Sequence, residues 1–490
     1  MPPTNPPPLA LHYRSNTLFI IATVAIGLFT DLFLYGLIVP VLPFMLRNRL
    51  SIPEPEIQSY VSNLLAAYAG ASVLSSVPAG WIADRTTSRQ APFLSGLAAL
   101  LAATVMLAFG RSIGVLFAAR VLQGVSAAVV WTIGLAMIMD TVGPANLGKV
   151  VGSVFSFISV GELMAPVIGG VLYEKTGYSG VFGVAAGVLG LDFVMRLLVV
   201  EKKTAAKYDA SLAVSDGGDE DRGAGPRGDD AGDRDEEAPT ENDALLPNKN
   251  ENSRYKINSP PNRLTRTLPI LLCFRNPRLL VGFSLAFVQA SLLAVFDATI
   301  PTEASSLFGF ASLDAGLLFI ALDIPYLILG PVAGWAVDQY GTKFASVLGF
   351  GYLVPTLILL RLPSDHPLSG GSNVVLYCAL LALNGVGLAV IGSPSVVETS
   401  YVVQEYDRAN PGLFGANGPY AQLYGFNSLF FCAGLTVGPV VAGALRDGIG
   451  YGNMNLVFAI VSGLTAIASL FVIGGKLQGN FRLWRKGRVN

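Results

Sequence analysis

The sequence is poor in charged residues, and this scarcity excludes several classes of protein. Asp, Glu, Lys and Arg make up 13% of the 490 residues, about half the ~25% that is usual in soluble proteins. Residues 201–275 carry 27 of these 65 side chains, so only about 9% of the remaining chain is charged. A folded surface in water needs far more charge. A soluble enzyme is therefore excluded, as is a nucleic-acid-binding protein, which needs a basic stripe.

Histidine and cysteine are also scarce. The two histidines are His12 and His366, and the three cysteines are far apart with no C-x-x-C spacing. A zinc site, a disulfide framework and a histidine proton relay are all excluded by this pattern. The chain also lacks a nucleophile–base pair and a glycine-rich phosphate loop. We therefore expect no enzymatic activity, no metal and no cofactor. Any proton transfer by this protein must use carboxylates.

What the chain has in abundance is long apolar runs. A helix needs ~20 mostly apolar residues to cross the hydrocarbon layer of a bilayer. Twelve such runs are present, and they predict an all-α membrane protein in contact with the lipid bilayer. The predicted spans are residues 18–43, 59–82, 91–110, 113–138, 148–173, 179–200, 279–302, 314–337, 344–362, 374–400, 419–444 and 453–474.

The basic residues predict the orientation. If both termini are cytoplasmic, the inside segments hold 24 Lys and Arg and the outside loops hold six, as the positive-inside rule requires. The predicted organisation is a cytoplasmic N-terminal tail (1–16), a six-helix half (17–200), a disordered cytoplasmic linker (201–277), a second six-helix half (278–475) and a basic cytoplasmic tail (476–490). The linker is rich in Asp, Gly, Asn and Pro, a composition that cannot bury enough apolar surface to fold.

An internal repeat supports the two halves. The segment Pro-Ala-Gly-Trp-Ile-Ala-Asp (78–84) ends the second span, and Val-Ala-Gly-Trp-Ala-Val-Asp (332–338) ends the eighth. A second pair, G-x3-A-P-x2-G-G (161–170) and G-x3-G-P-x2-A-G (434–443), lies in the fifth and eleventh spans. Each motif thus recurs at the equivalent span of the other half, which predicts two parallel six-helix repeats.

This repeat resembles the major facilitator superfamily, and the first pair resembles its signature loop between spans 2 and 3. The residues that carry the resemblance are Gly80, Asp84, Arg85 and Arg89, although the usual Gly-Arg at positions 87–88 is Thr-Ser here. The second half repeats the pattern with Asp338 and Lys343. A carboxylate and a basic residue at a helix end can latch the two halves together, so these six residues form a predicted cytoplasmic gate. The alternative reading is plain topogenic charge.

Two further motifs resemble the drug/proton antiporter branch of that superfamily, in particular fungal multidrug and secondary-metabolite exporters. Arg120, in Arg-x2-Gln-Gly, resembles the motif of span 4, where a buried arginine must be paired or face a cavity. The glycine–proline runs permit close helix contact and kink the helix. Their span-5 copy resembles the family motif that marks antiporters. The motif residues are Gly161, Pro166, Gly169 and Gly170, with Gly438 and Pro439 in the repeat.

The few acids inside the spans are the candidates for proton coupling or substrate binding. The sequence around Asp31 resembles span 1 of vesicular amine transporters, because the acid is followed by Val-Pro-Val-Leu-Pro (39–43). The sequence around Asp297 resembles their span 7, because this acid is followed by Ala-Thr-Ile-Pro. The lysine of those transporters in span 2 aligns with Tyr68. The remaining candidates are Glu162, Asp323 and Glu398, and each of them can titrate or pair with an arginine.

The resemblance implies a secondary active transporter that exports a small organic compound by proton antiport with alternating access. The expected partners are the substrate, protons and the bilayer, and the protein is expected to be a monomer. The alternatives are a vesicular or vacuolar amine exchanger and a non-transporting sensor with the same fold. The plasma membrane is the expected location and the vacuolar membrane the second.

Overall fold

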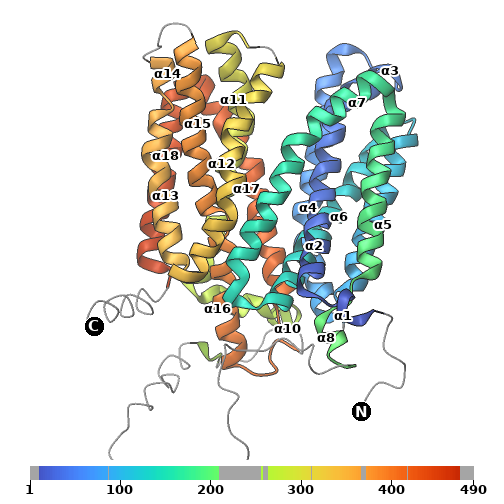
Figure 1. Cartoon of the computed structure of the whole chain (residues 1–490), viewed down its shortest axis with the longest axis vertical. Coiled ribbons are helices and arrows are strands. Elements are labelled where there is room, and N and C mark those ends of the chain that lie inside the picture. Colours follow the sequence, from blue (N-terminus) through green and yellow to red (C-terminus); the bar gives the residue numbers. More distant parts are fainter. Residues whose placement is uncertain are drawn as a thin grey trace, which may run out of the picture.

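The structure is a computed structural model that describes residues 10–86, 88–208, 255–257, 263–310, 312–365, 371–415 and 418–474. Within these ranges it is helical and contains no strands. Most of the predicted tails and of the predicted linker lies outside the described residues. Two groups of long helices stand side by side (Figure 1), as predicted for two six-helix halves.

The long helices follow the predicted spans closely. The first half contains α2 (Thr17–Ile38), α4 (Glu54–Arg85), α5 (Gln90–Phe109), α6 (Ile113–Val142) and α7 (Leu147–Leu198). The second half contains α11 (Pro277–Phe308), α12 (Ser312–Tyr340), α13 (Thr342–Leu359), α15 (Gly371–Ile391), α16 (Pro394–Ala409), α17 (Tyr420–Ile449) and α18 (Tyr451–Val472).

Eleven stretches of the described residues are long and apolar enough to cross a membrane. One of them contains α7, whose 52 residues would extend about 78 Å at ~1.5 Å per residue, more than twice the ~30 Å hydrocarbon layer. The backbone of Gly177 is non-helical, with φ 66° and ψ −154°, and breaks α7 into two limbs. Counting both limbs is consistent with the predicted twelve spans.

The predicted span at residues 374–400 also differs from the structure. It is divided between α15 and α16, which meet at Gly392 and Ser393. Pro394 follows as the first residue of α16, a position where its missing N–H is not needed by the helix. The chain therefore bends here while the apolar run continues.

Short helices mark the two ends of the molecule. The helices α1 (Leu11–Arg14), α8 (Lys202–Ala205) and α10 (Arg263–Thr267) lie at one end, which we call the linker end, and α3 (Leu42–Asn48) and α14 (Leu362–Asp365) lie at the far end (Figure 1). The remaining short elements are the 3-10 turns η1 (Val39–Val41), η2 (Pro144–Asn146) and η5 (Pro269–Arg275).

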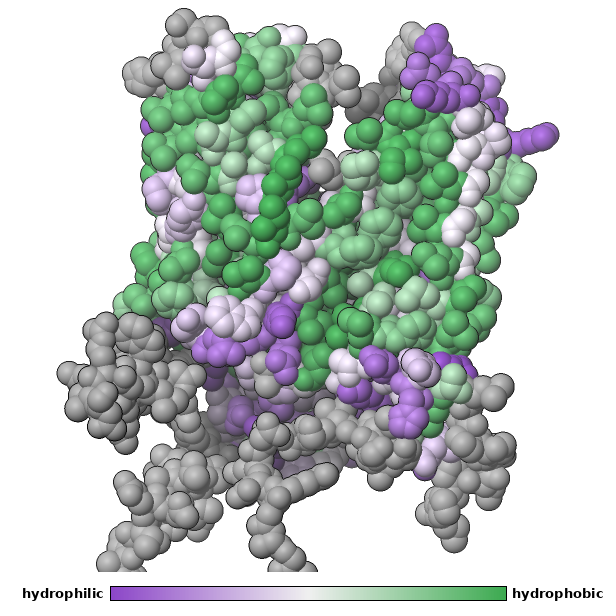
Figure 2. Space-filling view, in the orientation of Figure 1, coloured by the Kyte–Doolittle hydropathy of each residue, from purple (hydrophilic) through white to green (hydrophobic). Residues whose placement is uncertain are grey.

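The outer surface between the two ends is apolar. Figure 2 shows a broad apolar band, with polar residues gathered at the linker end and at one corner of the far end. Large apolar side chains of the long helices are highly exposed, including Leu74 at 78%, Phe109 at 75% and Phe471 at 80%. Exposure of this extent fits contact with lipid chains rather than water.

The buried core shows how the halves are joined. One cluster at the linker end combines residues of both halves, such as Val24 and Val151 with Val337 and Tyr424. Two other clusters each belong to a single half. The halves therefore share a core at the linker end only, and Figure 2 shows the surface hollowed between them at the far end.

The described ends of the predicted linker pack against the two halves. Glu201 accepts hydrogen bonds from the Ser88 hydroxyl at 2.6 Å and the Gln90 backbone N–H at 2.7 Å, at the start of α5. In the second half, Asn410 donates to the Tyr255 carbonyl at 2.9 Å and accepts from the Ile257 N–H at 2.9 Å. Both ends of this segment are thus anchored at the linker end.

Candidate functional site

The predicted gate residue Asp84 joins the two halves. It lies in the last turn of α4, and its carboxylate accepts from the backbone N–H groups of Ala421 at 2.9 Å and Gln422 at 2.8 Å. These two residues belong to the first turn of α17. A carboxylate at a helix N-terminus satisfies free N–H groups and complements the helix dipole. Asp84 therefore caps a helix of the opposite half.

Asp338 makes the equivalent contact in the other direction. It lies near the end of α12 and accepts from the N–H groups of Gly148 at 2.8 Å and Lys149 at 2.7 Å, in the first turn of α7. The repeated sequence motif thus produces two latches of the same kind. Lys343, the other predicted gate residue of this half, lies in the first turn of α13.

The arginines of the gate have separate roles. Arg89 donates to Asp84 at 2.8 Å and to Asp140 of α6 at 3.3 Å. Burial lowers the pKa of Arg89, but the negative charges of Asp140 and Asp84 outweigh it and raise this pKa above its ordinary value. Arg89 therefore stays charged and holds Asp84 in place. Arg85 instead lies over the ring of Trp81, 4.3 Å from its centre.

Small residues allow the halves to touch beside the latches. A Cβ atom at Gly80 of α4 would overlap the carbonyl of Ala421 in α17. Further along the same two helices, the hydroxyls of Ser76 and Ser428 lie 3.3 Å apart and the Ser72 hydroxyl lies 3.8 Å from the Cys432 thiol. We call this contact the α4–α17 seam. It closes the space between the halves from the linker end toward the middle of the helices.

A matching seam joins α7 and α12. A Cβ atom at Gly152 would overlap the carbonyl of Gly330, and one at Gly148 would lie 2.7 Å from the carbonyl of Gly334. The two helix backbones are therefore as close as glycine permits. With both seams formed, the linker end is closed.

Asp31 lies in α2, hydrogen-bonded to Trp131, whose ring stacks on that of Phe431 in α17 of the other half. The side chain of Asp31 is fully buried, and one carboxylate oxygen accepts from the Tyr68 hydroxyl and the Trp131 indole N–H, each at 3.3 Å. The other oxygen has no hydrogen-bond partner. Both donors are neutral, so Asp31 is a buried acid without an ion pair among the described residues.

Three other acids form a second group, which we call the acidic cluster: Glu162 of α7, Asp297 of α11 and Asp323 of α12. The negative charges of Glu162 and Asp323 both act on Asp297, and Glu162 also acts on Asp323. The side chains of Glu162 and Asp297 are solvent exposed and that of Asp323 is partly exposed. The structure thus brings together three of the predicted residues from both halves.

Arg120 of α6 is fully buried beside Tyr35. Its guanidinium carbon lies 5.6 Å from the centre of the Tyr35 ring. Tyr35 packs against Tyr68, with 4.6 Å between ring centres and the ring planes tilted by 32°. Its hydroxyl group is influenced by the charges of Arg120, Glu162 and Asp297. Tyr35 is therefore influenced both by the buried guanidinium and by two acids of the cluster.

Glu398 is not brought to this region. It is fully buried in α16, where it accepts from Arg278 at 2.8 Å and from the Thr342 hydroxyl at the start of α13. Asp192 is bound in the same way by Arg196, at 2.7 Å. Glu398 joins three helices of the second half, whereas the Asp192–Arg196 pair lies within α7 and reaches α5 through the bond from Arg196 to the Phe93 carbonyl. Both acids are thus engaged with arginines of their own half.

The residues of the predicted antiporter motif pack within each half. In α7, a Cβ at Gly161 would lie 2.6 Å from the Phe29 ring, and one at Gly169 would overlap the carbonyl of Leu37 in α2. Pro166 interrupts the same helix, and a Cβ at Gly170 would meet open space. In α17, a Cβ at Gly438 would lie 2.7 Å from the carbonyl of Ser291 in α11, and Pro439 follows inside the helix.

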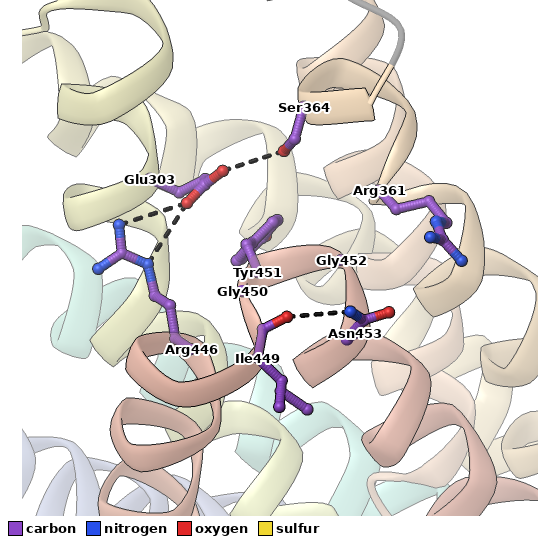
Figure 3. A pocket seen from close by; sticks show the side chains of 9 residues that line it. All are labelled: Glu303, Arg361, Ser364, Arg446, Ile449, Gly450, Tyr451, Gly452 and Asn453. Atoms are coloured by element: carbon purple, nitrogen blue, oxygen red, sulfur yellow. Dashed lines mark hydrogen bonds and ion pairs between the residues drawn. The ribbon is translucent and has the colours of Figure 1, made fainter.

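A cavity of about 440 Å³ lies at the far end of the second half (Figure 3). Glu303 of α11 points into it, and accepts from Arg446 at 3.3 Å and from the Ser364 hydroxyl at 3.0 Å. Arg361 and Asn453 also line it. The charges in this cavity bind helices of one half together. Sequence reasoning missed them because no motif contains Glu303 or Arg446.

Comparison with known proteins identifies the class. Residues 24–410 match the model of the Major Facilitator Superfamily. The chain is 49% identical over 483 residues to the MFS-type transporter ppzB of Metarhizium rileyi, a match that covers 97% of this chain and 99% of the relative. The protein therefore belongs to the major facilitator superfamily and is an integral, multi-pass membrane transporter, as the sequence motifs predicted.

Two further matches agree with the fold and with the distant resemblance. The proton:xylose symporter XylE superposes with a TM-score of 0.66 at 12% identity, over 92% of this chain and 94% of that structure. The probable vesicular acetylcholine transporter-B of Danio rerio is 35% identical over 186 residues, 37% of this chain and 38% of the relative. Members of this superfamily carry small molecules.

Proposed function

We propose that this transporter exports a small organic cation in exchange for protons, by alternating access to a cavity between its halves. The linker end is the cytoplasmic end in this proposal. The two latches and two seams then close the cytoplasmic side, and the arrangement is open to the outside. Opening the latches while the far end closes would expose the same cavity to the cytoplasm.

The observation that carries the proposal is the environment of Asp31. A charge in a membrane helix is costly unless it is paired. Asp31 has two neutral donors and one oxygen without a partner. Such a carboxyl group is suited to take a proton when the cavity is open to one side and to lose it when substrate binds from the other. One-for-one exchange of a proton for a monovalent cation moves no net charge across the membrane, so the pH difference drives it. Each unit of pH difference supplies ~1.4 kcal/mol, enough for about a tenfold concentration gradient of the substrate.

The acidic cluster supports a positively charged substrate. Glu162, Asp297 and Asp323 have no ion pair with a cation among the described residues, and Trp131 and Tyr35 supply aromatic faces that attract cations nearby. The partial likeness to vesicular acetylcholine transporters points the same way. We place this exporter in the plasma membrane as a monomer, with the vacuolar membrane as the alternative location.

Replacing Asp31 with asparagine tests the coupling. In sealed vesicles that contain a pH-sensitive dye, we expect an organic cation to drive proton flux through the wild type and to drive only background flux through Asp31→Asn. Asparagine keeps the shape and accepts from Tyr68 and Trp131, but its side chain does not titrate and so cannot take up or release a proton during the cycle.

The matched control is Glu405→Gln, which alters an exposed acid that pairs with Arg408 at the linker end. This variant is expected to keep the wild-type flux. If Asp31→Asn also keeps it, Asp31 is not the coupling site, and Asp297→Asn is the next variant to measure in the same assay.

A further inference from the structure

Trp131 of α6 contacts both the candidate proton site and the opposite half of the protein. Its indole N–H donates to a carboxylate oxygen of Asp31 at 3.3 Å. Its ring stacks on that of Phe431 in α17, with 6.4 Å between ring centres and 21° between the ring planes. The ring centre also lies 6.0 Å from that of Phe155 in α7. One side chain therefore joins Asp31 to a helix of the other half.

The contact between Trp131 and Phe431 depends on closure of the linker end. Phe431 is next in sequence to Cys432, which lies 3.8 Å from the Ser72 hydroxyl across the α4–α17 seam. When the halves separate at this end, α17 moves away from the first half and Phe431 moves with it. The indole of Trp131 then loses the ring that it stacks on in the closed arrangement.

The bond from Trp131 favours the ionised form of Asp31. A hydrogen bond to a carboxylate is roughly twice as strong as one between neutral groups, so protonation of Asp31 weakens this bond. The second donor, the Tyr68 hydroxyl at 3.3 Å, belongs to the same half as Asp31 and does not touch α17 through this bond. Because linkage is reciprocal, a bond that closure holds in place for ionised Asp31 also favours closure while Asp31 is ionised.

The other charged and titratable groups that face Asp31 do not make this connection. Arg196 and Asp192 of α7 both act on Asp31, but they bind each other at 2.7 Å within the same half. The Cys432 thiol of α17 is influenced by the charge of Asp31, but it forms no hydrogen bond with that carboxylate. Among the described residues, Trp131 is thus the donor to Asp31 that also contacts the other half.

We propose that Trp131 is a positioning residue that links the ionisation of Asp31 to closure of the linker end. This inference rests on the proposed exchange of protons for an organic cation and specifies how that exchange is coupled. While Asp31 is ionised and empty, its bond holds the indole against Phe431 and keeps the linker end closed. A proton or a cationic substrate that neutralises Asp31 weakens this hold. The open, empty form is thereby disfavoured, so the proton leaves on the cytoplasmic side when substrate takes its place.

The test measures opening of the α4–α17 seam in the absence of substrate. Ser76 is buried in this seam. The thiol of Ser76→Cys, in a full-length chain whose three native cysteines are replaced by serine, is therefore expected to react with a maleimide only when the seam opens. At alkaline pH in detergent, we expect Trp131→Phe to raise the alkylation rate about tenfold, the usual effect of losing a hydrogen bond to a charged group. Asp31→Asn is expected to raise the rate to a similar extent.

The double variant distinguishes the proposed link from two independent structural effects. Trp131→Phe combined with Asp31→Asn should react about as fast as either single variant, because both changes break the same link. The inference is overturned if the two effects multiply to about a hundredfold, or if either single variant reacts at the wild-type rate.

The matched control is Phe471→Leu, which alters an exposed aromatic side chain of α18 and is expected to keep the wild-type rate. If Trp131→Phe does not fold, Phe431→Leu takes its place in the same comparison with Asp31→Asn. Leucine at this position removes the ring that stacks on the indole and leaves the indole N–H intact.

Proton flux in proteoliposomes separates this inference from the proposed function. If an organic cation drives proton flux that depends on Asp31, but both single variants are alkylated at the wild-type rate, the link through Trp131 is wrong and proton antiport stands. If the double variant behaves as expected but no organic cation drives proton flux, proton antiport is wrong and the link between Asp31 and closure stands.

Discussion

Gly80→Leu is expected to lower transport about ten- to a hundredfold while the protein still folds. A Cβ at Gly80 would overlap the carbonyl of Ala421 and lie 2.9 Å from the Cα of Gln422. These are backbone atoms of α17 and cannot turn away as a side chain can. The overlap can be removed only if α4 and α17 move apart, and this movement breaks the hydrogen bonds between Asp84 and the start of α17. Overpacking of this kind costs ~1–3 kcal/mol, and the penalty applies only to the state in which the linker end is closed.

Gly70→Leu is the matched control, because it makes the same substitution in the same helix. A Cβ at Gly70 would have no atom within 4 Å, so transport should remain at the wild-type rate. The measurement is efflux of a fluorescent organic cation from proteoliposomes at matched protein content. Wild-type efflux through Gly80→Leu would show that the α4–α17 seam does not need to close during transport.

Asp192→Ala is expected to lower the free energy of unfolding by about 3–5 kcal/mol. Asp192 and Arg196 are both fully buried, and Arg196 donates to both Asp192 oxygens at 2.7 Å. Arg196 also donates to the Phe93 carbonyl at 2.7 Å and lies 3.8 Å from the centre of the Phe93 ring. Removal of Asp192 alone leaves this guanidinium buried without its counter-charge. Thermal unfolding in detergent measures the loss.

The double variant Asp192→Leu, Arg196→Met is the control for that prediction. It removes both charges and keeps similar volume, so most of the lost stability should return. A change below about 1 kcal/mol in Asp192→Ala would contradict a structural role for this pair. The result also separates Asp192 from Asp31, whose replacement should alter proton flux and leave stability nearly unchanged.

The sequence alone predicted the membrane class, the two halves and most helix positions. These features depend on apolar length and on repeated motifs, both of which are local properties of the chain. The repeat also predicted Asp84 and Asp338 as gate residues. The sequence did not reveal that each carboxylate caps a helix of the opposite half. The segments that supply the N–H groups, around Gly148 and Ala421, carry no side-chain signal for this role.

The sequence also did not predict which groups donate hydrogen bonds to the buried acids. Asp31 and Glu398 are both acids in predicted apolar spans, yet one is bonded to neutral donors and the other is paired with Arg278. That difference arises from helix packing between residues 37 to 120 positions apart in the sequence, which local periodicity does not encode. Tyr68 could be aligned with a lysine of other transporters, but its contact with Asp31 required the fold.

Reversible closure of the linker end is the central claim, and a disulfide across the α4–α17 seam tests it directly. Ser72 and Cys432 face each other across the seam with 3.8 Å between the hydroxyl oxygen and the sulfur. Ser72→Cys is expected to form a disulfide with the native Cys432 under mild oxidation, detected by the two halves staying joined after cleavage of the chain within residues 209–254.

The prediction is that this disulfide stops substrate-linked proton flux and that a reducing agent restores it. Ser72→Cys combined with Cys432→Ser should form no disulfide and keep its flux under the same oxidation. Undiminished flux through the fully crosslinked protein would contradict the claim, because the seam would then stay closed throughout the transport cycle.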